Sequence, residues 1–270
     1  MALAFFNGEF TEESELFIHV SDLSIHRGYA VFEYFKLIDG KNPWFDWYMD
    51  RFFASMKTAD LTIPFTREDI KKITETIVER NQAQNSCIKL ITTGGYSEDG
   101  FTPLKRENFL VLNKEIKQLP PSSYTEGIKL ITYEYQRPMP EVKSTNYFNS
   151  VALGRKLRKE QAVDVLYISQ NELRETSRCN IFLVFKDHIA TPAKEILQGI
   201  TRRRILNMTD PPLPIVERQI NREELRNAQE VFISSTTKNA LPVSAVDNIE
   251  IGTGRVGDVT QKILDKLSEF

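Results

Sequence analysis

The stretches Glu141-Val142-Lys143-Ser144-Thr145-Asn146-Tyr147 and Glu175-Thr176-Ser177-Arg178-Cys179-Asn180 decide how this chain is interpreted. We expect each to lie on a loop at the edge of a strand, the first presenting a lysine and the second a carboxylate. A lysine amine can condense with an aldehyde as a Schiff base, and a carboxylate can keep a pyridine nitrogen protonated. Pyridoxal phosphate enzymes require both side chains. The pair alone is a weak signal, because the chain has many lysines and glutamates.

Three further motifs give the pair its weight, because each can bind a phosphate. Gln198-Gly199-Ile200-Thr201-Arg202 places a glycine turn before a predicted helix over residues 200–208, where backbone N–H groups have no helical partner. Phe232-Ile233-Ser234-Ser235-Thr236-Thr237 is a strand that ends in hydroxyl groups. Asp50-Arg51 places one arginine in a largely apolar helix, and its guanidinium could bind a phosphate bidentately.

In this order, the motifs resemble those of the class IV pyridoxal phosphate aminotransferases. That family includes branched-chain aminotransferases, D-amino-acid aminotransferases and aminodeoxychorismate lyase. The resemblance covers nearly the whole chain, although each motif is poorly specific by itself. Its motifs are Asn7-Gly8, Asp22, Val31-Phe32-Glu33, Asp50-Arg51, Lys143, residues 175–180, Ala190-Thr191-Pro192, Gly199-Ile200-Thr201-Arg202, Ser235-Thr236-Thr237, Pro242-Val243 and Gly252-Thr253-Gly254.

The resemblance implies a cofactor, pyridoxal 5'-phosphate, and a role for each matching residue. Lys143 is the Schiff-base lysine and proton shuttle, and Glu175 is the partner of the pyridine nitrogen, with Asn180 anchoring its turn. The positions that match the phosphate-binding cup are Arg51, Ile200, Thr201, Ser235 and Thr236.

Composition agrees with a soluble enzyme. The chain has 270 residues, 41% of them hydrophobic and 27% charged, with a net charge of −2. This charge predicts neither nucleic-acid nor membrane binding, and no apolar run is long enough to span a bilayer. The N-terminal residues lack a basic segment, and Cys87 and Cys179 suggest a reducing compartment, so we expect a cytoplasmic protein. The three histidines show no metal-ligand spacing, and we expect no metal site.

The predicted fold class is α+β, with two domains as in class IV aminotransferases. Residues 118–123 are rich in proline and serine and form the best candidate linker. They separate a small N-terminal domain, residues 1–117, from a larger cofactor-binding domain with a mixed, barrel-like sheet, residues 124–270. The expected strands are 31–37, 87–93, 108–113, 128–135, 163–169, 181–185 and 231–235; the expected helices are 48–59, 70–80 after an N-cap at Thr66, 147–159, 200–208 and 259–267.

The substrate class depends on finer features. Asn146 follows Lys143 by three residues, as in D-amino-acid aminotransferases and aminodeoxychorismate lyases, whereas branched-chain enzymes have a longer, glycine-containing spacing. We therefore favour transfer of an amino group between a D-amino acid, such as D-glutamate or D-alanine, and a 2-oxo acid, 2-oxoglutarate or pyruvate. A branched-chain L-amino-acid aminotransferase, an aminodeoxychorismate lyase and a non-catalytic cofactor-binding protein remain alternatives.

One feature departs from the D-amino-acid enzymes. They carry an Arg-x-His pair that binds the substrate carboxylate, but residues 92–101 here contain neither arginine nor histidine. Arg178 and Arg27 are candidates to replace the pair, unless each forms a surface or interface salt bridge. Tyr29 and Tyr147 could line the site or simply pack. The resemblance also implies a homodimer in which the segment around Arg27 helps to build the neighbouring subunit's site.

Overall fold

The computed structural model describes residues 2–268, and these divide into two compact units. The first unit comprises residues 1–117 and 142–146, and the second comprises residues 118–141 and 147–270. The segment that carries Lys143 therefore belongs to the first unit, although the sequence prediction assigned it to the domain over residues 124–270. Part of the predicted linker is a short helix, α4 (Ser122–Thr125).

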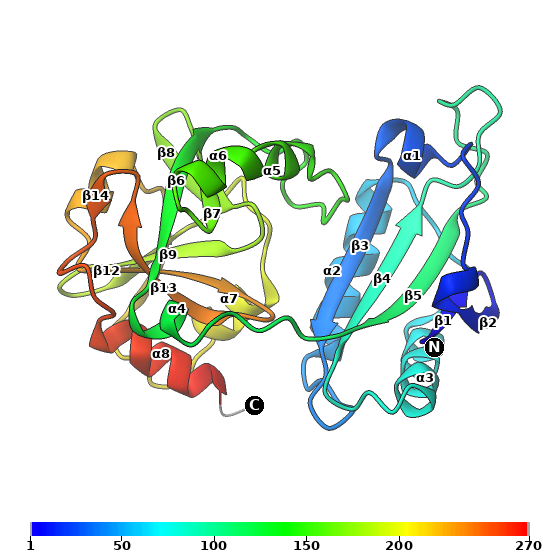
Figure 1. The fold of residues 1–270 in the computed structure, drawn as a ribbon, viewed down its shortest axis with the longest axis horizontal. Helices are drawn as coiled ribbons and strands as arrows, with labels where there is room; N and C mark the ends of the chain where they lie inside the picture. The colour runs from blue at the N-terminus through cyan, green and yellow to red at the C-terminus, as the bar shows by residue number, and fades with distance from the viewer. Residues whose placement is uncertain (1, 269–270) are drawn as a thin grey trace. The chain divides into compact units, whose positions relative to one another are not determined.

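The first unit is built on a five-stranded antiparallel sheet in the order β2-β1-β5-β4-β3 (Figure 1). Helix α2 packs against β3, and α3 packs against β1 and β5. Phe35, Phe52 and Phe109 are fully buried in its core. The elements are β1 (Leu3–Phe6), β2 (Glu9–Glu12), η1 (Glu13–Glu15), α1 (Leu23–Arg27), β3 (Ala30–Lys36), α2 (Phe45–Thr58), α3 (Arg67–Arg80), β4 (Cys87–Thr93) and β5 (Asn108–Lys114).

The second unit is built on a nine-stranded mixed sheet in the order β11-β10-β9-β12-β13-β6-β7-β8, with β14 paired to β13 (Figure 1). Phe182 and Phe232 stack in its core, with ring centroids 4.8 Å apart. The elements are β6 (Ile128–Glu134), α5 (Phe148–Ala152), α6 (Gly154–Lys159), β7 (Asp164–Ser169), β8 (Glu172–Thr176), β9 (Asn180–Val184), β10 (Ile189–Pro192), α7 (Ile200–Leu206), β11 (Ile215–Arg218), η2 (Arg222–Arg226), β12 (Glu230–Ser235), β13 (Asn239–Val246), β14 (Ile249–Glu250) and α8 (Asp258–Ser268).

The predicted α+β class is confirmed, and two local predictions are wrong. The expected helix over residues 147–159 is divided into α5 and α6, and the division falls at Leu153, directly before Gly154, a residue with low helix propensity. Glu175 lies inside β8 and not on a loop. None of the described helices is long and apolar enough to cross a membrane. Cys87 and Cys179 are buried free thiols.

The predicted start of α3 is confirmed and can be tested by mutation. The Thr66 hydroxyl accepts a hydrogen bond from the Asp69 N–H, and the Asp69 carboxylate accepts one from the Thr66 N–H. Thr66→Ala should lower the free energy of unfolding by about 1 kcal/mol in urea denaturation, because an N–H at the helix start loses its partner. Thr76→Ala, within the same helix, is the control. An equal loss in both variants would contradict the capping role.

Candidate active site

Lys143 is fixed by two elements of the first unit. Its backbone N–H donates to Ser55 Oγ of α2 at 3.1 Å, and its carbonyl accepts from the N–H of Phe32 in β3 at 2.9 Å. An isolated bridge between Val31 and Ser144 extends this pairing. The Lys143 ammonium lies 4.5 Å from the centre of the Phe32 ring. The backbone of the lysine is therefore held by hydrogen bonds to both α2 and β3.

Arg51 lies one turn before Ser55 on the same helix. Its Nε and Nη2 atoms donate to the two carboxylate oxygens of Glu33 at 2.9 and 2.7 Å. The Glu33 side chain has no exposed surface, and that of Arg51 is 11% exposed. A bidentate pair of this kind fixes the plane of the guanidinium group. Arg51 is thus oriented by Glu33, and its contact with a phosphate stays a prediction.

Arg27 is the last residue of α1 and Tyr29 follows two residues later, but their side chains have different surroundings. The guanidinium of Arg27 lies 5.7 Å from the ring centre of Phe101, within the loop that lacks the Arg-x-His pair. The Tyr29 hydroxyl donates to the carbonyl of Ala59 at the end of α2, and its ring packs against Gly94, where a Cβ atom would lie 2.3 Å away. These contacts are those of a packing residue, and a substrate-binding role for Tyr29 stays a prediction.

Glu175 is the centre of the second unit's candidate residues. Its side chain is 6% exposed. One oxygen accepts hydrogen bonds from Arg137 Nη1 at 2.8 Å and from the Leu197 N–H at 3.1 Å. The other accepts a long one from Asn180 Nδ2 at 3.4 Å. Three donors from three segments therefore stabilise one buried carboxylate.

Arg137 is a residue of this site that sequence analysis missed. Burial disfavours its charged form, but the charge of Glu175 and the hydrogen bond between them outweigh burial and raise the pKa of Arg137. The arginine therefore stays charged at every working pH and places a positive charge beside the Glu175 carboxyl group. The only signal in the sequence is a lone arginine directly before Pro138 and six residues before Lys143.

Asn180 joins Glu175 to the predicted phosphate-binding residues. Its Nδ2 atom also donates to the Leu197 carbonyl at 2.8 Å, and it lies opposite Ser234 in the β9–β12 ladder. A Cβ atom on Gly199 would lie 2.1 Å from Asn180 Oδ1. Only glycine therefore fits at position 199 unless the asparagine moves.

The residues around Asn180 can accept a phosphate group. Ile200 and Thr201 are buried in the first turn of α7, and Gly199 supplies no side-chain cap. The buried hydroxyls of Ser234 and Ser235 have no hydrogen-bond partner in the part of the chain that is described. A buried polar atom without a partner costs about 1–3 kcal/mol, which a phosphate oxygen would remove. Thr236 follows in the turn that Lys238 N–H closes on the Ser235 carbonyl at 3.2 Å.

Tyr147 and Arg178 belong to the electrostatic environment of Glu175. Burial raises the pKa of Tyr147 to about 12; Arg137 and Arg178 act in the opposite direction, and Glu175 adds to the rise. The Tyr147 phenol therefore keeps its proton and can donate a hydrogen bond. Among residues 2–268, neither Arg178 nor Arg27 forms an ion pair with a carboxylate. The intrachain salt bridges considered as an alternative role are absent from the described residues.

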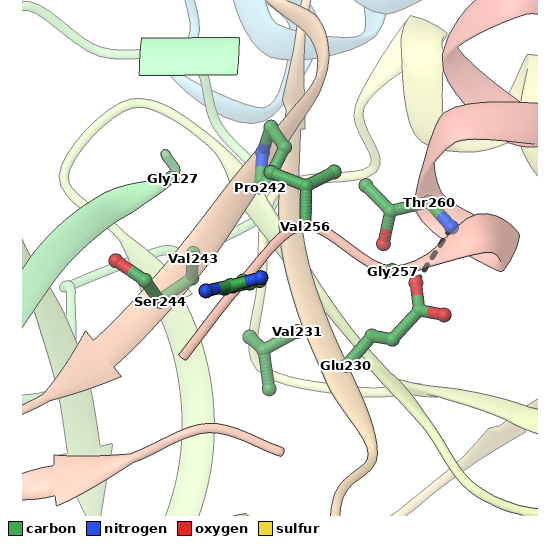
Figure 2. A pocket seen from close by; sticks show the side chains of 10 residues that line it. Gly127, Glu230, Val231, Pro242, Val243, Ser244, Val256, Gly257 and Thr260 are labelled. Atoms are coloured by element: carbon green, nitrogen blue, oxygen red, sulfur yellow. Dashed lines mark hydrogen bonds between the residues drawn. The ribbon is translucent and has the colours of Figure 1, made fainter. Parts of the chain in front are cut away.

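A small pocket of the second unit contains none of these residues. It has about 200 Å³ of empty space, which includes open solvent. Figure 2 shows it beside the start of α8. The Glu230 carboxylate accepts a hydrogen bond from the N–H of Thr260 at 2.7 Å, drawn as a dashed line in Figure 2, and a second from the N–H of Val259 at 3.0 Å. The pocket marks where Glu230 caps a helix.

Comparison with known proteins decides the family. The family model "Amino-transferase class IV" matches residues 30–246. The chain is a class IV aminotransferase. It is 29% identical to a Methanocaldococcus jannaschii protein assigned as a branched-chain-amino-acid aminotransferase, over 98% of this chain and 95% of that protein. It is 27% identical to D-alanine aminotransferase of Listeria monocytogenes, over 95% and 92%.

Solved structures agree with this class IV assignment. A branched-chain amino acid aminotransferase from T.th., solved with pyridoxamine 5'-phosphate, superposes with a TM-score of 0.91 at 25% identity, covering 99% of this chain and 93% of that one. The predicted family and fold class are confirmed. Class IV aminotransferases depend on pyridoxal phosphate, and so the predicted cofactor is confirmed as well.

The charge of Glu175 should matter more than its shape. Glu175→Gln keeps the size of the side chain but removes the charge opposite Arg137, and a charge-assisted hydrogen bond contributes about 1.5–3 kcal/mol. We expect kcat to fall at least tenfold in a steady-state assay. Glu230→Gln, which changes a partly buried helix cap in the same unit, is the control. Unchanged kinetics in Glu175→Gln would contradict the role of the carboxylate.

Proposed function

We propose that this class IV aminotransferase moves an amino group between a D-amino acid and a 2-oxo acid, with D-glutamate or D-alanine as donor and 2-oxoglutarate or pyruvate as acceptor. The observation that carries the proposal is the pair Arg27 and Arg178, two cations without a carboxylate partner in the described chain. Support comes from the short spacing between Lys143 and Asn146 and from the D-alanine aminotransferases among the relatives.

The chain supplies the groups that hold the cofactor and move the proton. When bound, pyridoxal phosphate supplies an electron sink for the carbon that exchanges the amino group. Lys143 would hold the cofactor covalently and, once displaced by substrate, its Nζ would carry the proton to and from the substrate. Glu175, ionised beside Arg137, would hold the ring nitrogen. Arg51, the first turn of α7 and the hydroxyls of Ser235 and Thr236 would hold the phosphate.

The substrate carboxylates need cations, because a carboxylate that leaves water is costly without a charged partner. Arg178 is the better candidate for the α-carboxylate, because its charge acts on Tyr147 together with that of Glu175. Arg27 is the candidate for a second carboxylate. Its guanidinium lies beside Phe101. Phe101 belongs to the loop that also carries Glu98 and Asp99, and these would repel an anion, so the loop itself cannot bind the carboxylate. By the family resemblance, Arg27 would act in the neighbouring subunit of a homodimer.

A branched-chain L-amino-acid aminotransferase is the second candidate, and the Methanocaldococcus jannaschii relative favours it. The two functions differ in the stereochemistry of the substrate and in the polarity of its side chain. Matched D- and L-forms of alanine, glutamate and leucine, each added singly to the holoenzyme, should decide between them. Loss of the cofactor's absorption band with the D-forms supports our proposal. Loss with L-leucine and not with D-alanine or D-glutamate contradicts it.

Lys143 should be the only lysine that holds the cofactor. Lys143→Ala should abolish turnover while leaving the circular dichroism spectrum unchanged. Reduction of the wild-type holoenzyme with borohydride, followed by peptide mapping, should place the label on Lys143. Lys89, whose ammonium lies 5.5 Å from the same Phe32 ring, is the matched control in Lys89→Ala. A label on any other lysine would refute the assignment.

The two arginines should differ in the substrates they affect. Arg178→Ala should lower kcat/KM for every substrate about 10- to 100-fold, the loss of one charge-assisted contact. Arg27→Ala should lower kcat/KM for D-glutamate by that factor and for D-alanine much less. Steady-state kinetics on both substrates measure this. If either variant keeps the parent values, its arginine does not bind substrate.

A mixed dimer tests whether Arg27 acts across the subunit interface. A hybrid of an Arg27→Ala subunit and a Lys143→Ala subunit would contain one site with both residues intact if Arg27 comes from the neighbour. Activity on D-glutamate should then exceed that of either parent dimer. No gain in the hybrid would place Arg27 in its own subunit's site.

A further inference from the structure

Arg174 precedes Glu175 in β8, and its side chain is equally buried, with 6% of its surface exposed. Its Nε donates to Gln136 Oε1 at 2.8 Å, and its two terminal nitrogens pair with Glu172 at 2.5 Å and Glu195 at 2.6 Å. This guanidinium has no role in the proposed transfer of the amino group. A buried arginine with a partner at each nitrogen holds together the segments that carry those partners. Here these segments are β8 itself and the loops that contain Gln136 and Glu195.

Arg174 and Glu175 reach the same two loops. The loop after β6 supplies Gln136 to the arginine and Arg137 to the glutamate. The loop after β10 supplies Glu195 to the arginine, and its Leu197 N–H binds the glutamate. Each donor to Glu175 from these loops is therefore one or two residues from a group that Arg174 holds.

A β-bulge explains how neighbouring side chains can do this. Ile168 pairs with Leu173 and Leu166 with Thr176, so that Arg174 and Glu175 together face the single residue Tyr167. In an unbroken strand, successive side chains point to opposite faces. A bulge redirects one of them, and bulges are common beside active sites for this reason.

The two loops are also tied to each other at this point. Gln136 Nε2 donates to the Glu195 carbonyl at 3.1 Å. The backbone of Glu195 is left-handed, with a φ of 58°, which is unfavourable for a residue with a side chain. The Arg174 contact holds the side chain of the residue that adopts this conformation. Such a conformation persists only where its surroundings fix it.

We propose that Arg174 is a positioning residue for Glu175, acting through Gln136 and Glu195 on the loops that supply Arg137 and the Leu197 N–H. The inference rests on the proposed role of Glu175 toward the cofactor's ring nitrogen. Arg174 itself touches neither substrate nor cofactor in this scheme. Arg174 fixes the positions of the two donors, Arg137 and the Leu197 N–H, and these donors fix the position of the Glu175 carboxylate.

The test uses apoprotein reconstituted with pyridoxal phosphate and has two readouts besides turnover. These are the dissociation constant of the cofactor and the pH at which the bound cofactor's absorption changes. Arg174→Met, which keeps bulk and removes the guanidinium, should raise the dissociation constant about tenfold, the effect of one lost contact of about 1.4 kcal/mol. The pH midpoint should shift in the same direction as in Glu175→Gln, and by less. Arg174→Lys should lie between Arg174→Met and the parent.

A double-mutant cycle separates this role from a merely structural one. In a Glu175→Gln background, Arg174→Met should change the dissociation constant less than twofold and should not shift the pH midpoint further. The reason is that the side chain it positions has already lost its charge. An equal change in both backgrounds would overturn the proposal. Arg222→Met, which breaks an exposed pair with Asp247 in the same unit, is the control and should leave both readouts unchanged.

Two milder variants keep the test decisive if Arg174→Met does not fold. Glu195→Gln alters a side chain that is 55% exposed, and Gln136→Leu removes the amide that joins the loops. Each should raise the dissociation constant and shift the midpoint; no change in either variant refutes the proposal. If Glu175→Gln itself leaves both readouts unchanged, the proposed role of Glu175 fails instead.

Discussion

Glu175 is a negative charge kept almost entirely away from water, and the second unit is arranged around the need to compensate it. Removing an ionised carboxylate from water costs several kcal/mol unless donors replace the lost hydration. Arg137, the Leu197 N–H and Asn180 come from three segments separated in sequence, and all three converge on this carboxylate. The paths of the loops after β6 and β10 follow from that convergence.

The contacts of Asn180 also join Glu175 to the residues that we propose to hold the phosphate. Asn180 contacts both Glu175 and the Leu197 carbonyl, and its close approach to Gly199 sets where α7 begins. The first turn of α7 and the unpartnered hydroxyls of β12 are therefore placed relative to the carboxylate by one asparagine. Lys143 is fixed separately, by β3 and α2 of the first unit.

Sequence predicted the elements whose burial follows a simple pattern, because periodic apolar residues and helix caps are local signals. The strand at 87–93 and the Thr66 cap of α3 are examples. It missed β8, whose sequence Glu172-Leu173-Arg174-Glu175-Thr176 is too charged to indicate a buried strand. It also missed Arg137 and Arg174, because their importance arises from contacts with distant loops and a bulge, which no local pattern encodes. The candidate catalytic residues were found through ordered motifs, and their supporting partners were not.

The chain passes from the first unit to the second, back for residues 142–146, and to the second again. The backbone that pairs with β3 at Phe32 therefore comes from a segment whose neighbours in sequence both lie in the other unit. The two units cannot be exchanged with those of a relative by a single crossover at residue 118. A chimaera joined there would combine one parent's β3 with the other parent's lysine segment, so both must be chosen together. The Lys143 segment thus belongs to the first unit, although a crossover at residue 118 would bring it in with the sequence of the second.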